Sequence, residues 1–488
     1  MRLKDLIEAV RPLSVSGRTD VEVRSVVHDS RQVEPGALFA AVRGRKADAS
    51  RFIPDAVERG AVAVIAEAPV PAARAAVLHV ANARRALADA ACAFHGHPSR
   101  RLSVLGITGT NGKTTVSYMI RSVLEGEGLG TGLVGTIRYV MGERTIPADR
   151  TTPEATDLQE MLAGMAHAGC AAAVMEVSSH SLVQERVRGV EFDEAVFTNL
   201  TQDHLDYHGT VENYYAAKRM LFTDYCSGAK ACRAIVNLDD AFGARLLKEC
   251  ACREKIAYGE SPGAQVRPER ISLGAEGSAF TVRSPWGDAE LRLRLLGRYN
   301  VSNALAAFAA CAALGVKPGR IAAALSAMTA VPGRLQELQT GRGFQVFVDY
   351  AHTHDAIRNV LGTLREIARN RLIIVFGCGG DRDRGKRPLM GAAASELSDF
   401  AVVTSDNPRS EEPSAIIGEI IAGVKRRDRV EVIEDRREAI GRAMAMAEPG
   451  DIVLIAGKGH ENTQSVGDKV FPFDDTQVAR EWLEQNHR

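Results

Sequence analysis

The stretch from Gly106 to Thr115 constrains this chain most strongly and reads Gly-Ile-Thr-Gly-Thr-Asn-Gly-Lys-Thr-Thr. An apolar run over 102–105 precedes it, and a helix-like segment over 116–124 follows it. A strand, a glycine-rich turn, Lys-Thr and a helix form the layout of a phosphate-binding loop, because backbone N–H groups and the helix N-terminus can hold phosphate oxygens. We therefore expect Lys113 to contact the terminal phosphates of a nucleotide and Thr114 to bind Mg²⁺.

The spacing of this loop departs from the common G-x-x-x-x-G-K-[ST] pattern. Ile107 takes the first glycine position, Gly106 stands one position early, and Gly109 lies inside the loop. The alternative to a nucleotide site is a glycine-rich turn that binds no ligand.

The length of 488 residues predicts about three domains. Two proline-containing stretches mark the expected boundaries, His97-Pro98 and Val331-Pro332-Gly333, because the residue before a proline is pushed out of the helical region. We expect a small α/β domain over 1–98, a central ATP-binding domain with a parallel sheet over 99–330, and a C-terminal Rossmann-like α/β domain over 331–488.

The charge balance and the cysteines limit the function classes. Lys plus Arg and Asp plus Glu both number 61, which argues against a nucleic-acid-binding protein. No apolar run is long enough to cross a bilayer, and the N-terminus lacks the apolar core of a signal peptide. The eight cysteines form no C-x-x-C pair, so we expect reduced thiols in a cytoplasmic protein and neither structural zinc nor a disulfide framework.

The N-terminal part contains three strand candidates, over 21–27, 37–42 and 61–65. The loop after the second one carries Arg43, Arg45 and Lys46, which would suit a phosphate-bearing ligand. A solvated basic loop without a ligand is the alternative.

The central part places polar residues where predicted strands end. Glu176 follows the apolar run 171–175, the position in which a second Mg²⁺ ligand is expected beside a phosphate loop. The loop over 198–208 holds two histidines and two aspartates, which suggests metal or phosphate chemistry. Lys218 lies in a helix-like segment, and taken alone it is a solvated helix lysine.

The C-terminal part has strand candidates over 345–348, 372–376, 400–403 and 451–455, each followed by a polar loop. Their continuous apolar character is typical of parallel strands buried on both faces, and ligands bind at the carboxyl ends of such strands. In the loop Asp406-Asn-Pro-Arg409, Arg409 can bind a carboxylate with two hydrogen bonds, and Arg382 in the neighbouring loop can add a second contact. An amino acid or peptide with several carboxylates is the expected ligand.

Six motifs occur together in the order found in one enzyme family. They are Gly109-Thr-Asn-Gly-Lys-Thr114, Glu176-Val-Ser-Ser-His180, Asn199-Leu-Thr-Gln-Asp-His204, Ala217-Lys218, Asp349-Tyr-Ala-His352 and Asp406-Asn-Pro-Arg409. The chain closely resembles the Mur ligases of peptidoglycan synthesis over nearly its whole length. The phosphate-loop spacing that is unusual elsewhere is the normal form in this family.

The resemblance implies a role for individual residues of this sequence. The residues implied to bind ATP are Gly109, Thr110, Asn111, Gly112, Lys113, Thr114, Thr115, Asn300 and His352. The implied Mg²⁺ ligands are Thr114, Glu176, His204 and Lys218, the last as a carbamate. The residues implied to serve catalysis are Lys113, Lys218, His204 and Glu176. For the UDP-sugar peptide it implies His28, Ser30, Arg45, Lys46, Ala47, Thr151, Thr152, Ser178, Gln184 and Arg186. For meso-diaminopimelate it implies Arg382, Asp406, Asn407, Pro408, Arg409, Gly457 and Glu461.

The activity that the resemblance implies is ATP-dependent amide formation in cell-wall precursor synthesis. Meso-diaminopimelate would be joined to the D-Glu γ-carboxylate of UDP-MurNAc-L-Ala-D-Glu through an acyl phosphate, by a cytoplasmic monomer that uses small-molecule substrates. The alternatives are a lysine-adding relative, an enzyme similar to folylpolyglutamate synthase, and a nucleotide-controlled binding switch without ligase chemistry.

Two positions depart from the family pattern. His354 follows Thr353 where the family usually has proline, which loosens a turn expected near the nucleotide. Arg150 precedes Thr151 where asparagine is common, so one substrate contact differs there.

Overall fold

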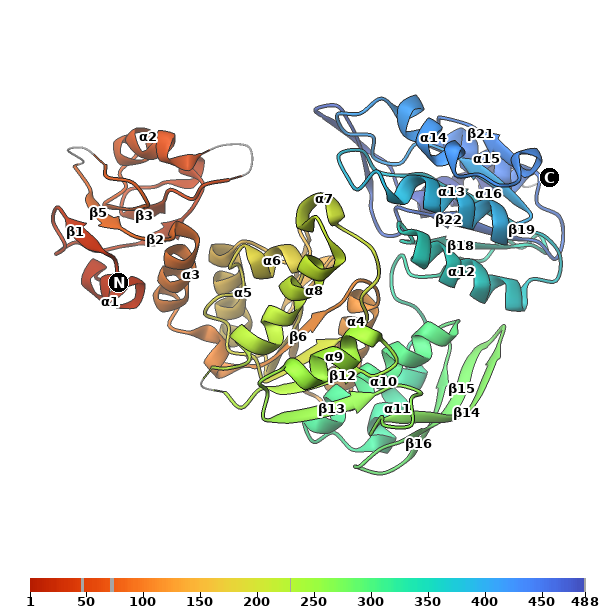
Figure 1. Cartoon of the computed structure of the whole chain (residues 1–488), viewed down its shortest axis with the longest axis horizontal. Helices are drawn as coiled ribbons and strands as arrows, with labels where there is room; N and C mark the ends of the chain where they lie inside the picture. The colour runs from red at the N-terminus through yellow and green to blue at the C-terminus, as the bar shows by residue number, and fades with distance from the viewer. Residues whose placement is uncertain (45–47, 71–73, 229, 487–488) are drawn as a thin grey trace.

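The computed structural model describes residues 1–44, 48–70, 74–228 and 230–486 (Figure 1). The chain forms an N-terminal, a central and a C-terminal part, and each is built around its own sheet. Figure 1 shows the N-terminal part at one end, the C-terminal part at the other, and the central part between them. This arrangement is the expected α/β fold with three parts.

The N-terminal part has a five-stranded sheet in the order β1-β5-β4-β3-β2. Its strands are β1 (Ser14–Ser16), β2 (Ser25–Val27), β3 (Ala37–Ala40), β4 (Ala63–Ala66) and β5 (Ala76–His79), and its helices are α1 (Leu3–Val10), α2 (Ile53–Glu58) and α3 (Ala83–Phe94). The expected strand over 21–27 is too long, because regular pairing with β3 is confined to its last three residues. An edge strand of this kind is held by one neighbour only, so its alternating pattern overstates its length.

The central part has an eight-stranded sheet in the order β13-β12-β11-β6-β10-β7-β8-β9. The first six strands in this order pair in parallel, and β8 and β9 add an antiparallel hairpin. The strands are β6 (Ser103–Thr108), β7 (Thr131–Val134), β8 (Arg138–Met141), β9 (Arg144–Pro147), β10 (Ala172–Glu176), β11 (Glu194–Phe197), β12 (Arg233–Asn237) and β13 (Glu254–Tyr258). The parallel core confirms the predicted sheet.

Helices cover both faces of this sheet. One apolar layer contains α4 (Lys113–Gly126), α10 (Arg298–Ala313) and α11 (Pro318–Ala327), together with a three-stranded antiparallel sheet of β14 (Arg267–Gly274), β15 (Gly277–Arg283) and β16 (Ala289–Leu293). The other layer contains α5 (Ala155–His167), α6 (Ser179–Val183), α8 (Val211–Met220) and α9 (Ala241–Glu249), and α7 (Leu205–His208) lies beside α8. Because both faces are buried, the strands read as continuous apolar runs.

The C-terminal part has a six-stranded sheet in the order β17-β18-β22-β19-β20-β21, with β17 antiparallel to its neighbour. Its strands are β17 (Gln336–Leu338), β18 (Gln345–Asp349), β19 (Leu372–Phe376), β20 (Phe400–Val403), β21 (Val430–Val432) and β22 (Ile452–Ala456), and a separate hairpin consists of β23 (Thr463–Val466) and β24 (Lys469–Pro472). The helices are α12 (His354–Ile367), α13 (Lys386–Leu397), α14 (Pro413–Ala422), α15 (Arg436–Ala445) and α16 (Asp475–Gln485). All four strands predicted here are present.

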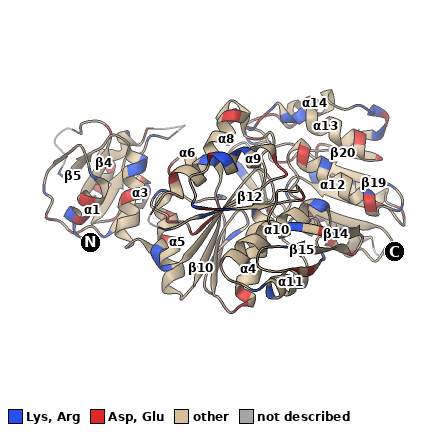
Figure 2. Ribbon diagram, turned by 60° about the horizontal axis from the view of Figure 1, so that its bottom comes forward, with Lys and Arg blue, Asp and Glu red and all other residues tan. Residues whose placement is uncertain are grey.

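The distribution of charge agrees with the zero net charge of the sequence. Figure 2 shows Lys and Arg side by side with Asp and Glu over all three parts. Among the described residues, no helix combines the length and the apolar character that crossing a bilayer requires.

The prediction of reduced thiols throughout the chain is wrong for one pair. Cys226 and Cys232 form a disulfide with a Cα–Cα distance of 5.2 Å, while the other six cysteines are free. The chain turns back between the segment that follows α8 and the start of β12, which brings the two residues together. A spacing of five residues between cysteines is not a recognised redox or metal motif, so the sequence alone gave no signal.

Candidate active site

A cavity of about 510 Å³ lies between the central and the C-terminal parts. This volume is typical of small-molecule sites. The predicted nucleotide and amino-acid residues that line it are Thr110, Asn111, Gly112, Lys113, Thr114, Thr115, Glu176, His204, Asn300, His352, Arg382, Asp406, Asn407, Arg409, Gly457 and Glu461. The structure therefore brings the two predicted groups of residues to one space.

The phosphate-loop segment joins β6 to α4 at the edge of this cavity. Gly109 has φ of 151° and Gly112 has φ of 89°, which side chains rarely tolerate. A Cβ atom at Gly109 would lie 1.8 Å from the Thr198 hydroxyl, so the loop needs glycine for space as well as for conformation. The Lys113 ammonium donates to the carbonyl oxygens of Gly109 and Thr110, each at 2.9 Å.

Oxygen ligands suited to Mg²⁺ gather behind this loop. Glu176 is the last residue of β10 and is fully buried. Its carboxylate accepts hydrogen bonds from the Thr114 hydroxyl at 3.0 Å, the Thr136 hydroxyl at 2.9 Å and the Thr136 N–H at 2.8 Å. A carboxylate and a hydroxyl are hard oxygen donors of the kind that Mg²⁺ prefers, so Glu176 and Thr114 fit this ion.

Lys218 is buried and not a solvated helix lysine. Its side chain projects from α8, and its Nζ donates to the Gly109 carbonyl oxygen at 2.7 Å, the same oxygen that Lys113 contacts. The ammonium also lies 4.4 Å from the centroid of the Tyr214 ring. Burial, reinforced by the charge of Lys113, lowers the pKa of Lys218 well below its usual value. A neutral amine is the form that can react with CO₂ to give a carbamate.

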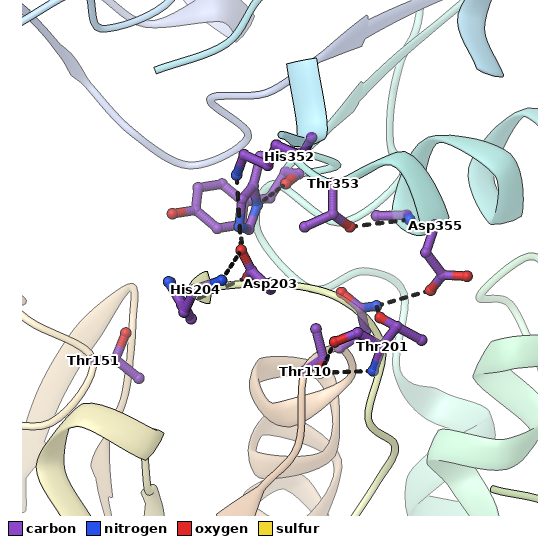
Figure 3. Close-up of polar contacts among 12 residues, drawn as sticks. Thr110, Thr151, Thr201, Asp203, His204, His352, Thr353 and Asp355 are labelled. Carbon is purple, nitrogen blue, oxygen red and sulfur yellow. Dashed lines mark hydrogen bonds and ion pairs between the residues drawn. The ribbon is translucent and has the colours of Figure 1, made fainter. Parts of the chain in front are cut away.

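His204 and His352 lie on either side of Asp203 (Figure 3). The distances from the Asp203 carboxylate are 3.5 Å to His204 Nε2 and 3.9 Å to His352 Nε2. Burial lowers the pKa of His204 to about 3 and that of His352 to about 4. Both imidazoles are therefore neutral near pH 7, which is the form that binds metal ions or accepts hydrogen bonds.

Two arginines face a pair of carboxylates at the carboxyl edge of the C-terminal sheet. Arg409 has a positive φ of 53°, and its guanidinium donates to the Gly380 carbonyl oxygen at 2.7 Å. Burial and the charge of Arg382 lower the pKa of Arg409. The carboxylates of Asp406 and Glu461 line the same space. Cations and anions in one pocket suit a ligand that carries both carboxylate and ammonium groups.

Asn407 and Glu461 are fixed relative to each other within this pocket. The Asn407 amide donates to the Glu461 carboxylate at 2.8 Å, and buried Lys458 donates to the Asn407 side-chain oxygen at 3.0 Å. Pro408 is not among the residues that line the cavity in the described part of the chain. Its ring instead lies in the turn that presents Asn407 and Arg409.

The residues expected to hold the UDP-sugar peptide lie largely outside the cavity. Among those in the described part of the chain, only Thr151 lines it, and Figure 3 shows Thr151 on a separate segment from Asp203 and the two histidines. Arg45, Lys46 and Ala47 fall outside the described residues. Ser30 is buried beside β2, and His28 contacts the Thr156 hydroxyl of the central part at 3.0 Å.

A chain of hydrogen bonds connects the other predicted peptide contacts. The Thr152 hydroxyl donates to the Glu176 carbonyl oxygen at 2.8 Å and to the Ser178 hydroxyl at 3.3 Å. Arg186 donates to the Thr152 carbonyl oxygen at 3.0 Å and to the Gln184 side chain at 2.6 Å. These side chains extend from the Mg²⁺-type ligands toward the N-terminal part.

Several cavity residues were missed by sequence reasoning. Arg334 donates to the Thr114 hydroxyl at 3.0 Å and lies 4.6 Å from the Tyr350 ring centroid. Lys386 lies 3.8 Å from the Asp203 carboxylate. Arg334 directly follows the predicted boundary Val331-Pro332-Gly333, and Lys386 is the first residue of α13. Neither position carries a local sequence signal for these contacts.

The two departures from the family pattern lie in ordered contacts. Thr353 caps α12 by accepting a hydrogen bond from the Ala356 N–H at 3.2 Å, and His354 is the first helical residue. Capping therefore supplies the order that a proline would supply at the start of this helix. Arg150 pairs with the Glu154 carboxylate, and its backbone contacts the Tyr139 hydroxyl.

Comparison with known proteins matches three family models to this chain. They are the Mur ligase family catalytic domain over residues 22–95, the Mur ligase middle domain over 107–311, and the Mur ligase glutamate ligase domain over 333–459. A UDP-N-acetylmuramoyl-L-alanyl-D-glutamate–2,6-diaminopimelate ligase from Geobacter metallireducens is 45% identical, with 97% of each chain covered. The enzyme of the same name from Solibacter usitatus is 46% identical, with 99% of this chain and 98% of the relative covered.

Solved structures give the same picture. A structure of a UDP-N-acetylmuramoyl-L-alanyl-D-glutamate–2,6-diaminopimelate ligase matches with a TM-score of 0.70 and 33% identity, covering 99% of both chains. A folylpolyglutamate synthase from Mycobacterium tuberculosis matches with a TM-score of 0.63 and 21% identity, covering 81% of this chain and 94% of that chain. The second likeness concerns the fold alone.

Proposed function

The chain belongs to the Mur ligase family, and on this premise we propose that it joins meso-2,6-diaminopimelate to the D-Glu γ-carboxylate of UDP-MurNAc-L-Ala-D-Glu at the expense of ATP. The observation that carries the proposal is that a phosphate loop and Asp406, Asn407 and Arg409 line one shared cavity. Relatives that cover nearly the whole chain bear the name of this activity.

The proposal divides the work among the three parts of the chain. Residues 1–98 hold the UDP-sugar, 99–330 bind ATP and activate the carboxylate, and 331–488 bind the amino acid. His28, Ser30, Arg45, Lys46 and Ala47 belong to the first task. Thr151, Thr152, Ser178, Gln184 and Arg186 hold the peptide along the hydrogen-bonded chain that begins at Glu176.

The first step is phosphorylation of the substrate carboxylate. A carboxylate has no good leaving group, and transfer of the γ-phosphoryl of ATP creates one. Lys113 and the N–H groups of the loop neutralise charge that develops on the transferred phosphoryl. Thr114, Glu176, His204 and carbamylated Lys218 would hold Mg²⁺, which supplies charge neutralisation at the phosphates when bound. Asn300 and His352 line the same cavity and would contact the bound nucleotide.

The second step is attack by an amine of the incoming amino acid on the acyl phosphate, with release of phosphate. Arg409 and Arg382 orient the amino acid by its carboxylates, while Asp406 and Glu461 bind its distal ammonium group. Such a two-ended clamp holds the attacking nitrogen in place and lowers the entropic part of the barrier. The cavity is lined by both the central and the C-terminal parts, so movement of these two parts toward each other would exclude water from the acyl phosphate.

The arginine in the Asp-Asn-Pro-Arg loop separates this activity from its alternatives. A lysine-adding relative would have no use for a guanidinium that binds a second carboxylate. A folylpolyglutamate synthase would not need the N-terminal part. A nucleotide switch would not need the charged residues at the carboxyl edge of the C-terminal sheet. We infer that the protein acts as a monomer in the cytoplasm, where its product serves cell-wall synthesis and division.

The test is phosphate release with ATP, Mg²⁺ and UDP-MurNAc-L-Ala-D-Glu, in the presence of either meso-diaminopimelate or L-lysine. We expect release and a tripeptide product, identified by its mass, only with meso-diaminopimelate. Release with lysine alone would keep the ligase chemistry and overturn the role of Arg409. ATP hydrolysis that is independent of the UDP-linked peptide would favour the nucleotide switch.

A further inference from the structure

A cluster of buried cysteines lies away from the cavity, on the face of the central sheet that carries α8. Cys226 follows a short π-helix, η4 (Leu221–Tyr225), that continues α8 directly. Cys232 precedes β12, and Cys252 lies between α9 and β13. The three sulfur atoms lie within 4.8 Å of one another, and all three residues are buried.

The surroundings of these sulfurs are largely apolar. The three cysteines pack in an apolar cluster with Phe222 and Leu246. Three sulfurs in an apolar setting select soft cations such as Zn²⁺ or Cu(I) over Mg²⁺. With Zn–S bonds of about 2.3 Å, tetrahedral geometry places neighbouring sulfurs about 3.8 Å apart. This distance is below the 4.8 Å within which the three sulfurs lie here, so only small shifts are needed to bind the ion.

The disulfide accounts for only two of the three sulfurs. Cys252 remains as a buried thiol whose Sγ approaches the Phe222 carbonyl oxygen at 3.5 Å. A second thiol, Cys250, is hydrogen-bonded to Cys252. A disulfide needs no third or fourth cysteine beside it, whereas a thiolate metal site does.

We propose that Cys226, Cys232 and Cys252 form a binding site for a soft divalent cation of the Zn²⁺ type in the reduced protein. A dithiol reductant first converts the disulfide to two thiols and becomes a disulfide itself, so two electrons and two protons enter the pair. The cation then replaces the protons of the three thiols, which are released to solvent. Cys250 is a positioning residue that orients Cys252.

Such a site would join three segments that are distant in sequence. The end of η4, the start of β12 and the α9–β13 connection would share one cation. Because η4 continues α8, the cation would also fix the C-terminal end of the helix that carries Lys218. Its first effect is on the stability of the central part, since a cation that binds only the folded chain stabilises it by mass action.

The test uses the full-length protein, reduced with a dithiol and then freed of it under anaerobic conditions. Titration with Co²⁺ should give one equivalent of bound metal with thiolate-to-cobalt charge-transfer absorption, and Zn²⁺ should displace it. Zn²⁺ should also raise the midpoint of thermal unfolding. No charge-transfer absorption in the reduced wild-type protein would overturn the proposal, as would persistence of the disulfide under the dithiol.

Variants separate this site from adventitious binding. Cys252→Ser and Cys226→Ser should each lose the charge-transfer absorption and the Zn²⁺-dependent rise in unfolding temperature. Cys170→Ser, which alters a buried cysteine in the same apolar cluster, should keep both. Equal Co²⁺ spectra for Cys252→Ser and the wild type would exclude the proposed ligand set. Circular dichroism of each variant without metal establishes that it is folded.

Discussion

The two walls of the cavity are built in different ways. The wall from the central part is built around one continuous stretch, Thr110 to Thr115, placed between a strand and a helix, and residues from strand ends and from α10 complete it. The wall from the C-terminal part is spread over four strand-end loops and residues of α12 and α13. The first wall therefore centres on one loop of a kind that recognises a common chemical group, while the second is distributed along the chain and recognises a particular ligand.

This difference predicts which substitutions abolish the reaction and which change its specificity. Substitutions in the central wall should lower turnover with every amino acid. Those in the C-terminal wall should act on the affinity for the amino acid and leave ATP binding nearly unchanged.

The largest effect is expected for Lys218→Ala, which removes the buried amine behind the phosphate loop. We expect the rate of phosphate release to fall by about 10²–10³, as on removal of a group that stabilises charge in the transition state. Added bicarbonate should not restore activity, because the variant has no amine to carbamylate. Wild-type protein labelled with ¹³C-bicarbonate should show a carbamate signal by NMR that the variant lacks.

Arg219→Ala is the matched control for Lys218, since it alters the next residue of α8, whose guanidinium contacts Glu249 instead of the loop. It should retain most of the activity. Wild-type turnover in Lys218→Ala would contradict the carbamate role.

The next effect is expected for Arg409→Ala, in the distributed wall. Loss of a charge-assisted hydrogen bond to a ligand carboxylate costs about 1.5–3 kcal/mol, which corresponds to a rise of about 10- to 160-fold in the KM for meso-diaminopimelate. The KM for ATP should change little. Arg384→Ala serves as the control, since it alters an exposed arginine of the neighbouring loop that carries Arg382, and its guanidinium pairs with Glu419. An equal rise in both KM values would mean that Arg409 does not belong to the amino-acid pocket.

The smallest effect is expected for Arg334→Lys, at the junction of the two walls. The substitution keeps the charge but loses the geometry of the hydrogen bond to the Thr114 hydroxyl. One hydrogen bond is worth about 1 kcal/mol, so kcat should fall about fivefold. Steady-state kinetics with saturating substrates would measure it. A loss confined to the KM for meso-diaminopimelate would assign Arg334 to the distributed wall instead.

Sequence patterns predicted the residues of each wall but not the contacts between the two walls, because such patterns are local. Glu176 is the last residue of β10, and Lys113 and Arg409 follow β6 and β20 within a few residues, so their positions near the sheet edges follow from local pattern. Arg334 and Lys386 contact residues far away along the chain, and their partners depend on how the two parts pack. No local pattern contains that information.

The antiparallel additions to the fold were missed for a related reason. Strands β14 to β16 carry alternating polar and apolar residues that face solvent on one side, unlike the continuous apolar runs of the parallel strands. The burial of Lys218 was also not predictable from the local sequence, because α8 mixes polar, aromatic and small apolar residues without a clear buried face. Only the resemblance to the family identified it.

The two carbonyl contacts of Lys113 have a consequence for nucleotide binding. The ammonium has three N–H donors, and the Gly109 and Thr110 carbonyl oxygens accept two hydrogen bonds from it, so a third donor can bind a phosphate oxygen without displacing them. The side chain is thus already ordered before a nucleotide arrives, which lowers the conformational entropy lost on binding. The loop acts as a preorganised cationic anchor, whose own backbone fixes the position of the charge.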